Sequence, residues 1–580
     1  MKQAFSILLL FLSSLCSVLH AKVIICVNQI GYTTGSSKDA IIVSEYGDSF
    51  NQKFEIINQS NHQSVFQGII KKEEAFTEWG KKSYYLIDFS ALKTAGKFYI
   101  KIIAADSIHS PVFEIGENIL AQKTLPALMH YFRNQRANTP QELGQDKNVL
   151  LYGSAKTVDL TGGWCDASGD VSKYFSHLSY ANFFSPQQIP LVTWSLIDAS
   201  ERMPELLGKL KLTDSIRDEA VYGADYLLKS LSEEGYFYMI VFSYFNKDPK
   251  ARRVVGLHAN SVTTDEYQCA FREGGGMAIA ALARISGWSM LGKNQRTNYL
   301  AGAKRAYEHL KINNLKYCDD GKENIIDNYC ALMAASELFK VTNDEYYLSE
   351  ARGWMQKLEA RLSPSGYFIS DDTGRPFFHA SDAGLPVIAL NRYLKLEKDK
   401  QYKSRAQNII NANLDYQNRI STEVSNPFGY PRQTFRNSAG IQKSFFIPHE
   451  NETGWWWQGE NARLASLASA ALVKEKDKSQ HTFATQQLNW ILGLNPYQMC
   501  FMYGMGENNV PYMASNYGHG SQKGGISNGI TGRSESGLGD GIDFKIEDKG
   551  NEWRWTEQWL PHAAWFLQAI TAMNAETDKR

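Results

Sequence analysis

The sequence predicts a multidomain chain in which a small all-β sandwich precedes an all-α barrel of the (α/α)6 type. Two observations predict this order. Short β-rich runs separated by turn residues fill the region 22–116, whereas hydrophobic residues recur with helical periodicity through the region 117–580. A chain of 580 residues is long enough for one large domain and one small domain.

The region 22–116 contains about seven candidate strands, counted as β-rich runs between turn signals. Examples are "KVIICVNQIGY", "KDAIIVSE", "KSYYLIDFS" and "GKFYIKII". Runs of this length and spacing are typical of a small β-sandwich. Little in this region has the residue types of a catalytic site, so we expect it to brace the helical domain.

The region 117–580 contains about twelve candidate helices by hydrophobic period. A heptad repeat is absent, which excludes a coiled coil. Twelve helices in six consecutive hairpins would suit an (α/α)6 barrel. The predicted loops are long and rich in Gly, Asn, Ser and aromatic residues, and function concentrates in such loops. They cover 137–177, 232–273, 362–381, 417–458 and 494–555.

The N-terminus "MKQAFSILLLFLSSLCSVLHA" predicts a signal peptide over residues 1–21. Lys2 precedes an apolar run, and Ala21 suits the cleavage site. We therefore expect an exported protein, periplasmic or extracellular. Leu15 is too bulky for a good lipobox before Cys16, so lipoprotein anchoring is not expected. No later segment reaches the ~20 apolar residues that span a bilayer.

Composition excludes several function classes. The chain has 61 basic and 61 acidic residues, so nothing favours a nucleic-acid partner. The cysteines are scattered without a CxxC pair, so no zinc site and no disulfide scaffold is predicted. GxSxG and HExxH motifs are absent, which leaves a serine hydrolase or a metalloprotease without support. Aromatic residues make up 12% and fit either a large core or a carbohydrate site.

The stretch "GGWCDASGD" at 162–170 places Asp166 and Asp170 four residues apart among small residues. Hydrolysis of a glycosidic bond needs one ionised carboxylate and one protonated carboxyl group. Two nearby aspartates can hold and deprotonate one water, and their repulsion would raise one pKa. The alternative is a turn or capping cluster, since Asp and Ser often satisfy backbone donors.

A distant acid is predicted in "KGNEWRWTEQWLPHAAWF" at 549–566. Glu552 stands between Asn551 and Trp553, and aromatic neighbours would raise the pKa of its carboxyl group. Glu557 is the competitor, but it lies at the predicted start of the last helix and could serve the helix dipole instead. An ordinary loop glutamate is the alternative for Glu552.

Aromatic residues and histidines near these acids are candidates for sugar binding, because aromatic rings stack on the apolar faces of sugars. "HENETGWWWQGENARLASLA" at 449–468 is the densest aromatic cluster. Each candidate alone is more often structural than functional. The substrate-binding candidates are Trp164, His449, Trp455, Trp456, Tyr517, His519 and Trp553.

Several motifs together resemble glycoside hydrolase family 9. "VNQIGY" resembles the opening of the immunoglobulin-like domain that precedes many bacterial cellulases, and "GGWCDASGDVSKY" resembles the family's GGW-DAGD--K signature. "REGGGMAIAALARIS", "WILGLNPYQMCFMYGMG" and "NEWRWTEQWLPHAAWFLQAI" fit its later segments in order and spacing. The resemblance covers essentially the whole chain after the signal peptide.

The resemblance implies an immunoglobulin-like sandwich, an (α/α)6 barrel and single-step inverting hydrolysis of β-glycosidic bonds. It implies Asp170 as the base, Asp166 as the residue that helps hold the water, and Glu552 as the acid of an "NE" pair. The base and the acid would stand ~6.5–9.5 Å apart. A β-linked poly- or oligosaccharide is the expected partner. No cofactor is required, and a structural calcium ion is left open.

The chain departs from the family pattern in two places. Ser168 lengthens the usual spacing of the two aspartates by one residue, and "YMASNYGHGSQKGG" at 512–525 stands where the family has a sugar-binding "HHR" segment. The glycan, and whether it is cut internally or at an end, therefore stay open. Two alternatives follow: a carbohydrate-binding protein that no longer cuts, or a lyase or epimerase using Tyr517, His519 or His449.

Overall fold

The computed structural model describes residues 23–45, 53–103, 108–176, 185–243, 248, 251–258, 262–289, 294–451, 454–455, 457–515 and 518–575. The predicted signal peptide and two of the predicted sugar-binding residues, Trp456 and Tyr517, lie outside these ranges. Among the described helices, none is both long enough and apolar enough to cross a membrane.

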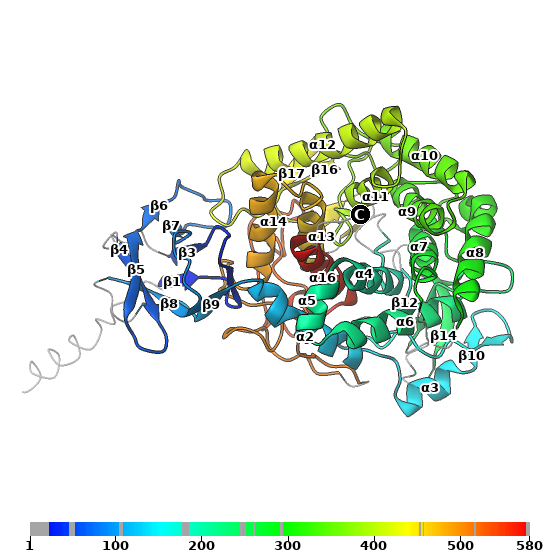
Figure 1. The fold of residues 1–580 in the computed structure, drawn as a ribbon, viewed down its shortest axis with the longest axis horizontal. Helices are drawn as coiled ribbons and strands as arrows, with labels where there is room; N and C mark the ends of the chain where they lie inside the picture. The colour runs from blue at the N-terminus through cyan, green and yellow to red at the C-terminus, as the bar shows by residue number, and fades with distance from the viewer. Residues whose placement is uncertain are drawn as a thin grey trace, which may run out of the picture.

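The N-terminal region folds as two facing sheets, at the left of Figure 1. The first sheet has the order β1 (Val23–Cys26), β3 (Asp39–Ser44), β7 (Ser83–Asp88) and β6 (Lys71–Lys72). The second has the order β2 (Gly31–Thr33), β9 (Phe113–Gly116), β8 (Gly96–Ile102), β4 (Lys53–Asn58) and β5 (Ser64–Ile69). Strand β8 shows why the sheets close on each other. Its apolar residues Phe98, Ile100 and Ile102 alternate with polar ones and are buried in the shared core.

Helices fill the rest of the chain, and contacts link one set of them into a closed cycle (Figure 1). In order around the cycle these are α4 (Ile189–Arg202), α7 (Gly276–Ile285), α9 (Ile325–Thr342), α11 (Leu385–Leu394), α13 (Asn461–Ala471) and α16 (Leu560–Asn574). Each packs against one helix of an outer set. The outer partners, in the same order, are α6 (Thr213–Lys229), α8 (Arg296–Tyr317), α10 (Glu345–Ala360), α12 (Lys400–Thr422), α14 (Lys478–Ile491) and α2 (Ile119–Asn134).

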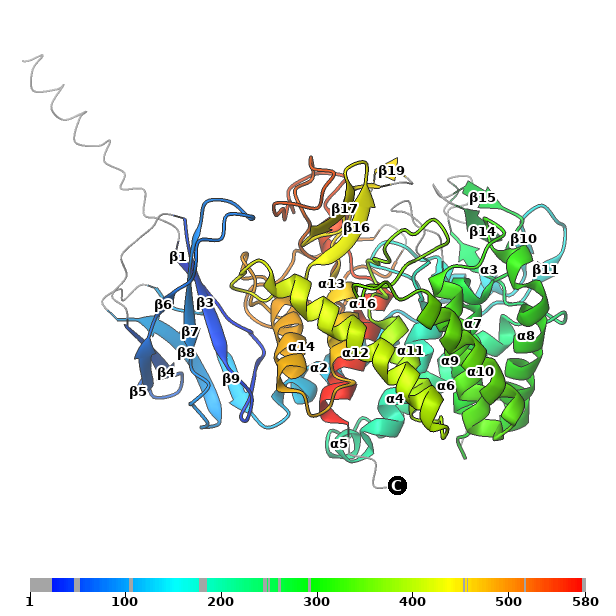
Figure 2. The ribbon, with the colours of Figure 1, turned by 90° about the horizontal axis from the view of Figure 1, so that it is seen from above.

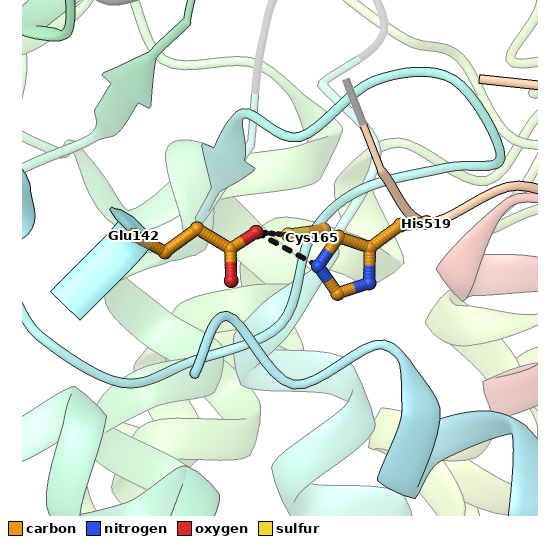
Figure 3. Close-up of side chains that lie close together, drawn as sticks. All are labelled: Glu142, Cys165 and His519. Carbon is orange, nitrogen blue, oxygen red and sulfur yellow. Dashed lines mark hydrogen bonds and ion pairs between the residues drawn. The ribbon is translucent and has the colours of Figure 1, made fainter. Parts of the chain in front are cut away.

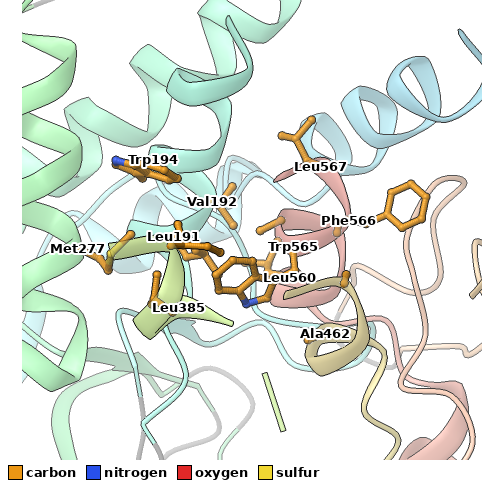
Figure 4. Close-up of a cluster of buried hydrophobic side chains, with 14 of the residues drawn as sticks. Leu191, Val192, Trp194, Met277, Leu385, Ala462, Leu560, Trp565, Phe566 and Leu567 are labelled. Carbon is orange, nitrogen blue, oxygen red and sulfur yellow. The ribbon is translucent and has the colours of Figure 1, made fainter. Parts of the chain in front are cut away.

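The inner helices are buried on every side. All residues of α7 are buried, and Figure 4 shows Met277 of this helix with Leu191 and Trp194 of α4 and Trp565 of α16 in one apolar cluster. The small residues of α7 allow this close packing. A Cβ atom at Gly276 would lie 2.6 Å from the backbone of Cys330 in α9. A helix that is apolar all round is the pattern expected for the centre of a large helical domain.

Helices α4 and α7 begin later than predicted, because a non-helical segment or a special turn precedes each of them. A helix is predicted over 178–200, but 185–188 is not helical and α4 begins only at Ile189. Pro190 occupies the first turn, where its missing N–H costs nothing. A π-turn, Phe271–Gly275, likewise precedes α7, and Gly274 has a φ of 93° there. Residues 177–184 lie outside the described ranges.

Short strands gather at one end of the helical domain, as Figure 2 shows for β10, β14, β15, β16 and β17. One small sheet has the order β11 (Thr157–Val158), β10 (Val149–Leu151), β14 (Arg253–His258), β13 (Ile240–Phe242) and β12 (Lys173–Tyr174), with β15 (Val262–Thr264) paired to β14. The others are the pairs β16 (Gln433–Asn437) with β17 (Gly440–Ser444) and β18 (Glu450–Asn451) with β19 (Gly454–Trp455). Strand β12 follows the two aspartates directly and anchors their loop.

The sandwich packs against the helical domain through an aromatic cluster. Trp79 lies 5.2 Å from Phe445, 5.6 Å from Trp490 and 5.9 Å from Tyr430, measured between ring centroids. Gln29 of the sandwich also contacts the helical domain, because its side chain forms hydrogen bonds with the loop after α14. The sandwich therefore shares a core with the helices instead of lying apart on a linker.

Candidate active site

The two predicted aspartates lie on a tight loop that enters β12. The Asp166 amide donates to the Ser172 carbonyl at 2.9 Å, and Ala167 pairs with Asp170 across the loop. Gly169 has a φ of 107°, a backbone conformation that L side chains rarely adopt. The loop therefore folds back on itself, and it gives the two carboxylates different surroundings.

Asp170 is half-buried and accepts hydrogen bonds on both carboxylate oxygens. Its Oδ1 accepts from the Ser172 amide at 2.8 Å and from the Ser243 hydroxyl at 3.4 Å. Its Oδ2 accepts from the Tyr174 hydroxyl at 3.1 Å. Burial, with the Asp170 charge as the next cause, raises the pKa of Tyr174 well above its usual range, so this phenol stays a donor. Donors of this kind favour an ionised carboxylate, the form that a general base needs.

Asp166 is buried and held by two side-chain donors. The Gln188 amide donates to its Oδ1 at 2.6 Å, and the Trp559 indole N–H reaches both oxygens at 3.1 and 3.2 Å. Burial raises the pKa of Asp166 well above its usual range, and the charges of Asp170 and Glu557 raise it further. Asp166, Asp170 and Glu557 are thus electrically coupled and share one site.

Glu557 approaches the aspartates because the chain is extended between α15 (Trp553–Thr556) and α16. Glu557 and Trp559 both have extended backbone, with ψ of 130° and 137°, so residues two apart lie on the same face. Trp559 binds Asp166 on that face. Burial raises the pKa of Glu557 to about 8, and repulsion from Asp170 adds to the shift, whereas a hydrogen bond with Asn528 opposes it. A carboxyl group with this pKa is protonated at neutral pH.

The structure distinguishes the two candidate acids, Glu552 and Glu557, by their surroundings. Glu552 lies at the other end of α15, where its backbone carbonyl accepts from the amides of Trp555 and Thr556. Its Oε2 is buried without a hydrogen-bond partner, and the charge that acts on both aspartates is that of Glu557. Glu552 precedes the short helix α15, and Glu557 follows it.

Ser168, the extra residue of the aspartate loop, joins that loop to the Glu557 segment. Its amide donates to the Gln558 carbonyl at 2.8 Å, and its hydroxyl accepts from the Gln558 amide at 2.8 Å. Ala167 also pairs with Trp559, and the Leu560 amide donates to the Asp166 carbonyl at 3.1 Å. The additional serine therefore does not separate the Asp166 backbone from the Glu557 segment. It pairs with the residue next to Glu557.

Two predicted sugar ligands are core residues. Trp164 has no exposed surface, and its indole N–H donates to Glu219 at 3.3 Å. His449 is 1% exposed and stacks on Trp457, and burial lowers the pKa of its imidazole to about 4. Neither side chain can touch a sugar in this conformation. Residue type and position in the sequence suggested that these two residues bind sugar, but their burial makes both side chains part of the core.

Trp457 and Trp553 flank the guanidinium group of Arg554, and Trp455 lies beside Trp457. Arg554 lies 3.7 Å from the ring centroid of Trp457 and 4.5 Å from that of Trp553. Trp455 is 44% exposed and lies edge-on to Trp457 at 6.4 Å. These are the described aromatic candidates that keep surface available near Glu557.

His519 has both ring nitrogens engaged within the protein. Its Nδ1 lies 2.9 Å from the Asn134 carbonyl and its Nε2 lies 2.7 Å from Glu142 Oε1. The Cys165 thiol donates to the same oxygen at 3.4 Å, as Figure 3 shows. Burial opposes ionisation of Glu142, but the hydrogen bond and charge of His519 lower its pKa to about 2. Through these contacts His519 joins its loop to α2 and to α3 (Pro140–Asp146).

Several site residues escaped prediction from the sequence. Gln188 and Ser243 lie far from the motif, and nothing in their neighbours marks them. Tyr174 and Trp559 had a usable signal. Tyr174 follows Asp170 by four residues in the same motif, and Trp559 follows Glu557 by two. In an extended segment, residues an even number apart lie on the same face, which would place Tyr174 beside Asp170 and Trp559 beside Glu557.

Comparison with known proteins gives matches to both parts of the chain. The family model "Glycosyl hydrolase family 9" matches residues 122–538, and "Cellulase N-terminal ig-like domain" matches residues 21–107. A xyloglucan-specific endo-β-1,4-glucanase of Bacteroides ovatus is 24% identical over 529 residues, covering 83% of this chain and 80% of its own. Endoglucanase 9 of Arabidopsis thaliana is 24% identical over 415 residues, covering 67% of this chain and 77% of its own.

Solved structures show the same fold. A metagenome-derived endoglucanase of the family superposes with a TM-score of 0.69 at 17% identity, covering 96% of this chain and 99% of its own. A Bacteroides ovatus family 9 structure gives 0.65 at 19% identity, covering 95% and 98%. The segment that carries Glu557 lies beyond the matched residues 122–538. Since the family model spans well over half of the sequence, this chain belongs to glycosyl hydrolase family 9 and is a glycoside hydrolase.

Proposed function

We propose that this protein cleaves β-glycosidic bonds of a β-glucan-type polysaccharide or oligosaccharide with inversion, using Asp170 as base and Glu557 as acid. The observation that carries the proposal is the coupling of three carboxyl groups in one site. Burial keeps Glu557 protonated at neutral pH, whereas Asp170 accepts hydrogen bonds from Ser172, Ser243 and Tyr174. Such a pair is what inverting hydrolysis requires.

The reaction follows from these two states. Asp170 accepts a proton from water while the water oxygen attacks the anomeric carbon. As the glycosidic C–O bond breaks, Glu557 gives its proton to the leaving oxygen. Asp166 orients the water, since Gln188 and Trp559 hold its carboxylate in place. Proton exchange with solvent restores both groups. Attack from the face opposite the leaving group inverts the anomeric configuration.

The surrounding architecture supports the same assignment. The closed cycle of inner helices, each with an outer partner, supports an (α/α)6 barrel for the helical domain. The apolar segment at 1–21 supports export, to the periplasm or beyond the cell. We propose Trp455 and Trp553 as substrate contacts. Trp553 lies beside Arg554, three residues before Glu557, and the exposed Trp455 lies edge-on to Trp457, the other ring beside Arg554.

Xyloglucan is the first substrate to test, because the Bacteroides ovatus relative bears that specificity in its name. Hydrolysis by two carboxyl groups needs no organic cofactor. A structural calcium ion would require a cage of oxygen ligands. Among the described residues, the gathered metal-ligating side chains are Glu142, Cys165 and His519, whose nitrogen and sulfur donors do not suit calcium.

The test is a reducing-sugar and product-profile assay of the wild type across β-glucans, xyloglucan and chito-oligosaccharides. Asp170→Asn is compared with the matched control Asp159→Asn at an exposed position. We expect turnover that Asp170→Asn abolishes and Asp159→Asn keeps, with proton NMR of the first product showing the inverted anomer.

Other outcomes have distinct readouts. Saccharide binding without product would mean a binding protein. An unsaturated product that absorbs in the ultraviolet would mean a lyase. Retained anomeric configuration, or full activity in Asp170→Asn, would contradict the proposed roles.

A further inference from the structure

A polar cavity of about 560 Å³ lies between the sandwich and the helical domain, where Figure 2 shows the sandwich facing α14 and α2. Its walls come from residues 31–37 of the sandwich, the N-terminus of α2, residues 475–489 and the end of α16. A volume of this size is typical of sites for small molecules. The described residues that line it include none of the three coupled carboxyl groups of the candidate active site.

Asn489 of α14 is a buried amide in the wall of this cavity, with 1% of its surface exposed. Its orientation is fixed by Asn28 of the "VNQIGY" motif. The Oδ1 of Asn28 accepts from the amides of Ile30 and Gly31 at 3.0 and 3.1 Å. The Nδ2 of Asn28 is therefore the donor, and it donates to Asn489 Oδ1 at 2.8 Å.

This arrangement leaves the Nδ2 of Asn489 as a donor that points away from Asn28. It is buried, and the part of the chain that the structure describes offers it no acceptor. A buried donor without an acceptor destabilises a protein, so such groups in native structures are normally satisfied by a further group. An acceptor in the cavity would satisfy this one.

The N-terminus of α2 supplies further donors at the same cavity. Asn118 precedes the helix with a φ of 49°, and its side chain does not cap the helix. The first turn of α2 contains no acidic residue, and its residues Leu120 and Ala121 line the cavity. The first backbone amides of a helix have no partner within the helix, and the helix dipole attracts anions to this end.

The charged side chains of the cavity also favour an anion. Lys476 and Lys478 line it, and within the described residues neither has a carboxylate partner. Glu475 is the one carboxylate of the described lining, and it lies 3.8 Å from Lys395. The positive charge of the two lysines is therefore not neutralised by the walls.

Hydroxyl groups make up much of the remaining lining. Thr482 and Thr485 donate to backbone carbonyls four residues earlier, at 3.0 and 2.8 Å, and Ser36 donates to the Thr33 carbonyl at 2.8 Å. Because their protons are engaged, these oxygens are left as acceptors for the hydroxyl groups of a ligand.

We propose that this cavity binds an anionic sugar, a saccharide that carries a phosphate or a carboxylate group. Its anion would lie at the N-terminus of α2, near the lysines, and its hydroxyl groups would contact the threonines and Ser36. Such a ligand touches both domains at once, so binding should raise the thermal midpoint of the protein.

The test is isothermal titration calorimetry on the full-length protein. The probes are glucose 6-phosphate and glucuronic acid, which combine a sugar with an anion, and inorganic phosphate and glucose, which supply one part each. We expect one anionic sugar to bind at least about tenfold more tightly than phosphate or glucose, because it makes both sets of hydrogen bonds. The tighter of the two anionic sugars identifies the anion.

Matched variants place the bound sugar. Gly35→Glu adds a carboxylate to the cavity, and a Cβ atom at Gly35 has no atom within 4 Å, so the variant should fold. We expect it to weaken binding by at least about tenfold through like-charge repulsion. Gly353→Glu makes the same change in open space on α10 and should bind like the wild type. Lys478→Gln should also weaken binding, whereas Lys316→Gln, exposed on α8, should not.

Three results would overturn the proposal. One is the absence of binding heat from both anionic sugars. Another is equal binding by Gly35→Glu and the wild type, which would place the sugar elsewhere. The third is inorganic phosphate or glucose bound as tightly as the anionic sugars, which would mean an adventitious ion only or a site for neutral sugar. None of these readouts depends on glycan turnover, so this proposal and the proposed function can fail separately.

Discussion

The two glutamates at the ends of α15 provide the sharpest test at the scale of single residues. Glu557 is coupled to Asp170, while Glu552 only begins the helix. Glu557→Gln removes the proton that the leaving oxygen needs, so we expect kcat to fall by about 10²–10⁴-fold. Glu552→Gln changes the same residue type nearby and should keep activity within about threefold by the same reasoning. Steady-state kinetics on the best glucan measure both. If Glu552→Gln instead lowers kcat more than Glu557→Gln does, Glu552 is the acid.

The raised pKa of Glu557 predicts how activity and stability depend on pH. The acid works while protonated, so kcat should fall as pH rises through about 8. Because its folded pKa lies above its unfolded value, the stability that Glu557 contributes is complete below the unfolded pKa and is lost as pH rises through the folded pKa.

Glu557→Gln keeps a neutral side chain at every pH, which gives a matched measurement of stability. Its thermal midpoint should exceed that of the wild type at pH 9 and equal it near pH 4. Differential scanning calorimetry at both pH values checks this, with Glu552→Gln as the control. Equal thermal midpoints of Glu557→Gln and the wild type at pH 9 would show that the ionised Glu557 carboxylate does not destabilise the folded protein.

Single residues also show where prediction from sequence fails. The aspartate pair was found because residue type and spacing are visible in the sequence. The choice between Glu552 and Glu557 depended on backbone conformation: a helix was predicted from residue 556, but the chain is extended from Glu557 to Trp559. Burial was equally hidden. Trp164 lies in the signature motif, yet tertiary packing places it wholly in the core.

At the scale of elements, the aspartate loop and the Glu557 segment behave as one unit through Ser168. Ser168→Ala keeps the backbone contact with the Gln558 carbonyl but removes the hydroxyl that accepts the Gln558 amide. The unpaired amide should cost about 1–3 kcal/mol of stability. Because Gln558 adjoins the acid, we expect kcat to fall several-fold with little change in KM.

Two readouts separate positioning from simple destabilisation. The alkaline limb of the pH–kcat profile should shift in Ser168→Ala, since the distance between Glu557 and Asp170 contributes to the pKa. Ser438→Ala, at an exposed turn, is the control and should change neither kcat nor the pH–kcat profile. A wild-type kcat and profile in Ser168→Ala would show that the inserted serine is neutral.

Most elements could be predicted because their periodicity is strong. The helices predicted over 324–340 and 343–361 lie within two residues of α9 and α10, which is the usual scatter of helix ends. The helix predicted over 401–416 is α12, which continues to Thr422. The π-turn before α7 could not be predicted, because its cause is tertiary. Gly274 and Gly275 approach Phe175 and Ala270 so closely that a Cβ atom would lie 2.8 and 2.6 Å from them.

At the scale of the whole molecule, the "VNQIGY" motif joins the sandwich to the loop that leads toward the site. Gln29 is 5% exposed, and its side chain makes three hydrogen bonds to the loop after α14. Its Nε2 donates to the Gln498 carbonyl at 2.8 Å, and its Oε1 accepts from the amides of Glu507 and Asn508 at 2.9 and 3.0 Å. The sequence predicts that the β-rich region supports the helical domain, and the contacts of Gln29 give this support a physical basis.

The loop held by Gln29 continues toward the site. Beyond Asn508 it reaches Ser527, whose backbone pairs with Gln558 beside the acid. The site is therefore supported from two sides, by the aspartate loop and by a loop fixed to the sandwich. Loss of the Gln29 contacts should be felt both in stability and in catalysis.

Gln29→Ala tests this coupling. It removes three hydrogen bonds to the backbone of the loop after α14, and each contributes about 0.5–1.5 kcal/mol. We expect a lower thermal midpoint in one cooperative transition, because Trp79 keeps the two domains in a common core. We also expect a several-fold lower kcat. Gln67→Ala, on the exposed edge strand β5, removes a glutamine without touching the helical domain and should change neither quantity. If the sandwich of Gln29→Ala instead unfolds in a separate, earlier transition while kcat is unchanged, the sandwich is an appended module and the helical domain holds its site alone.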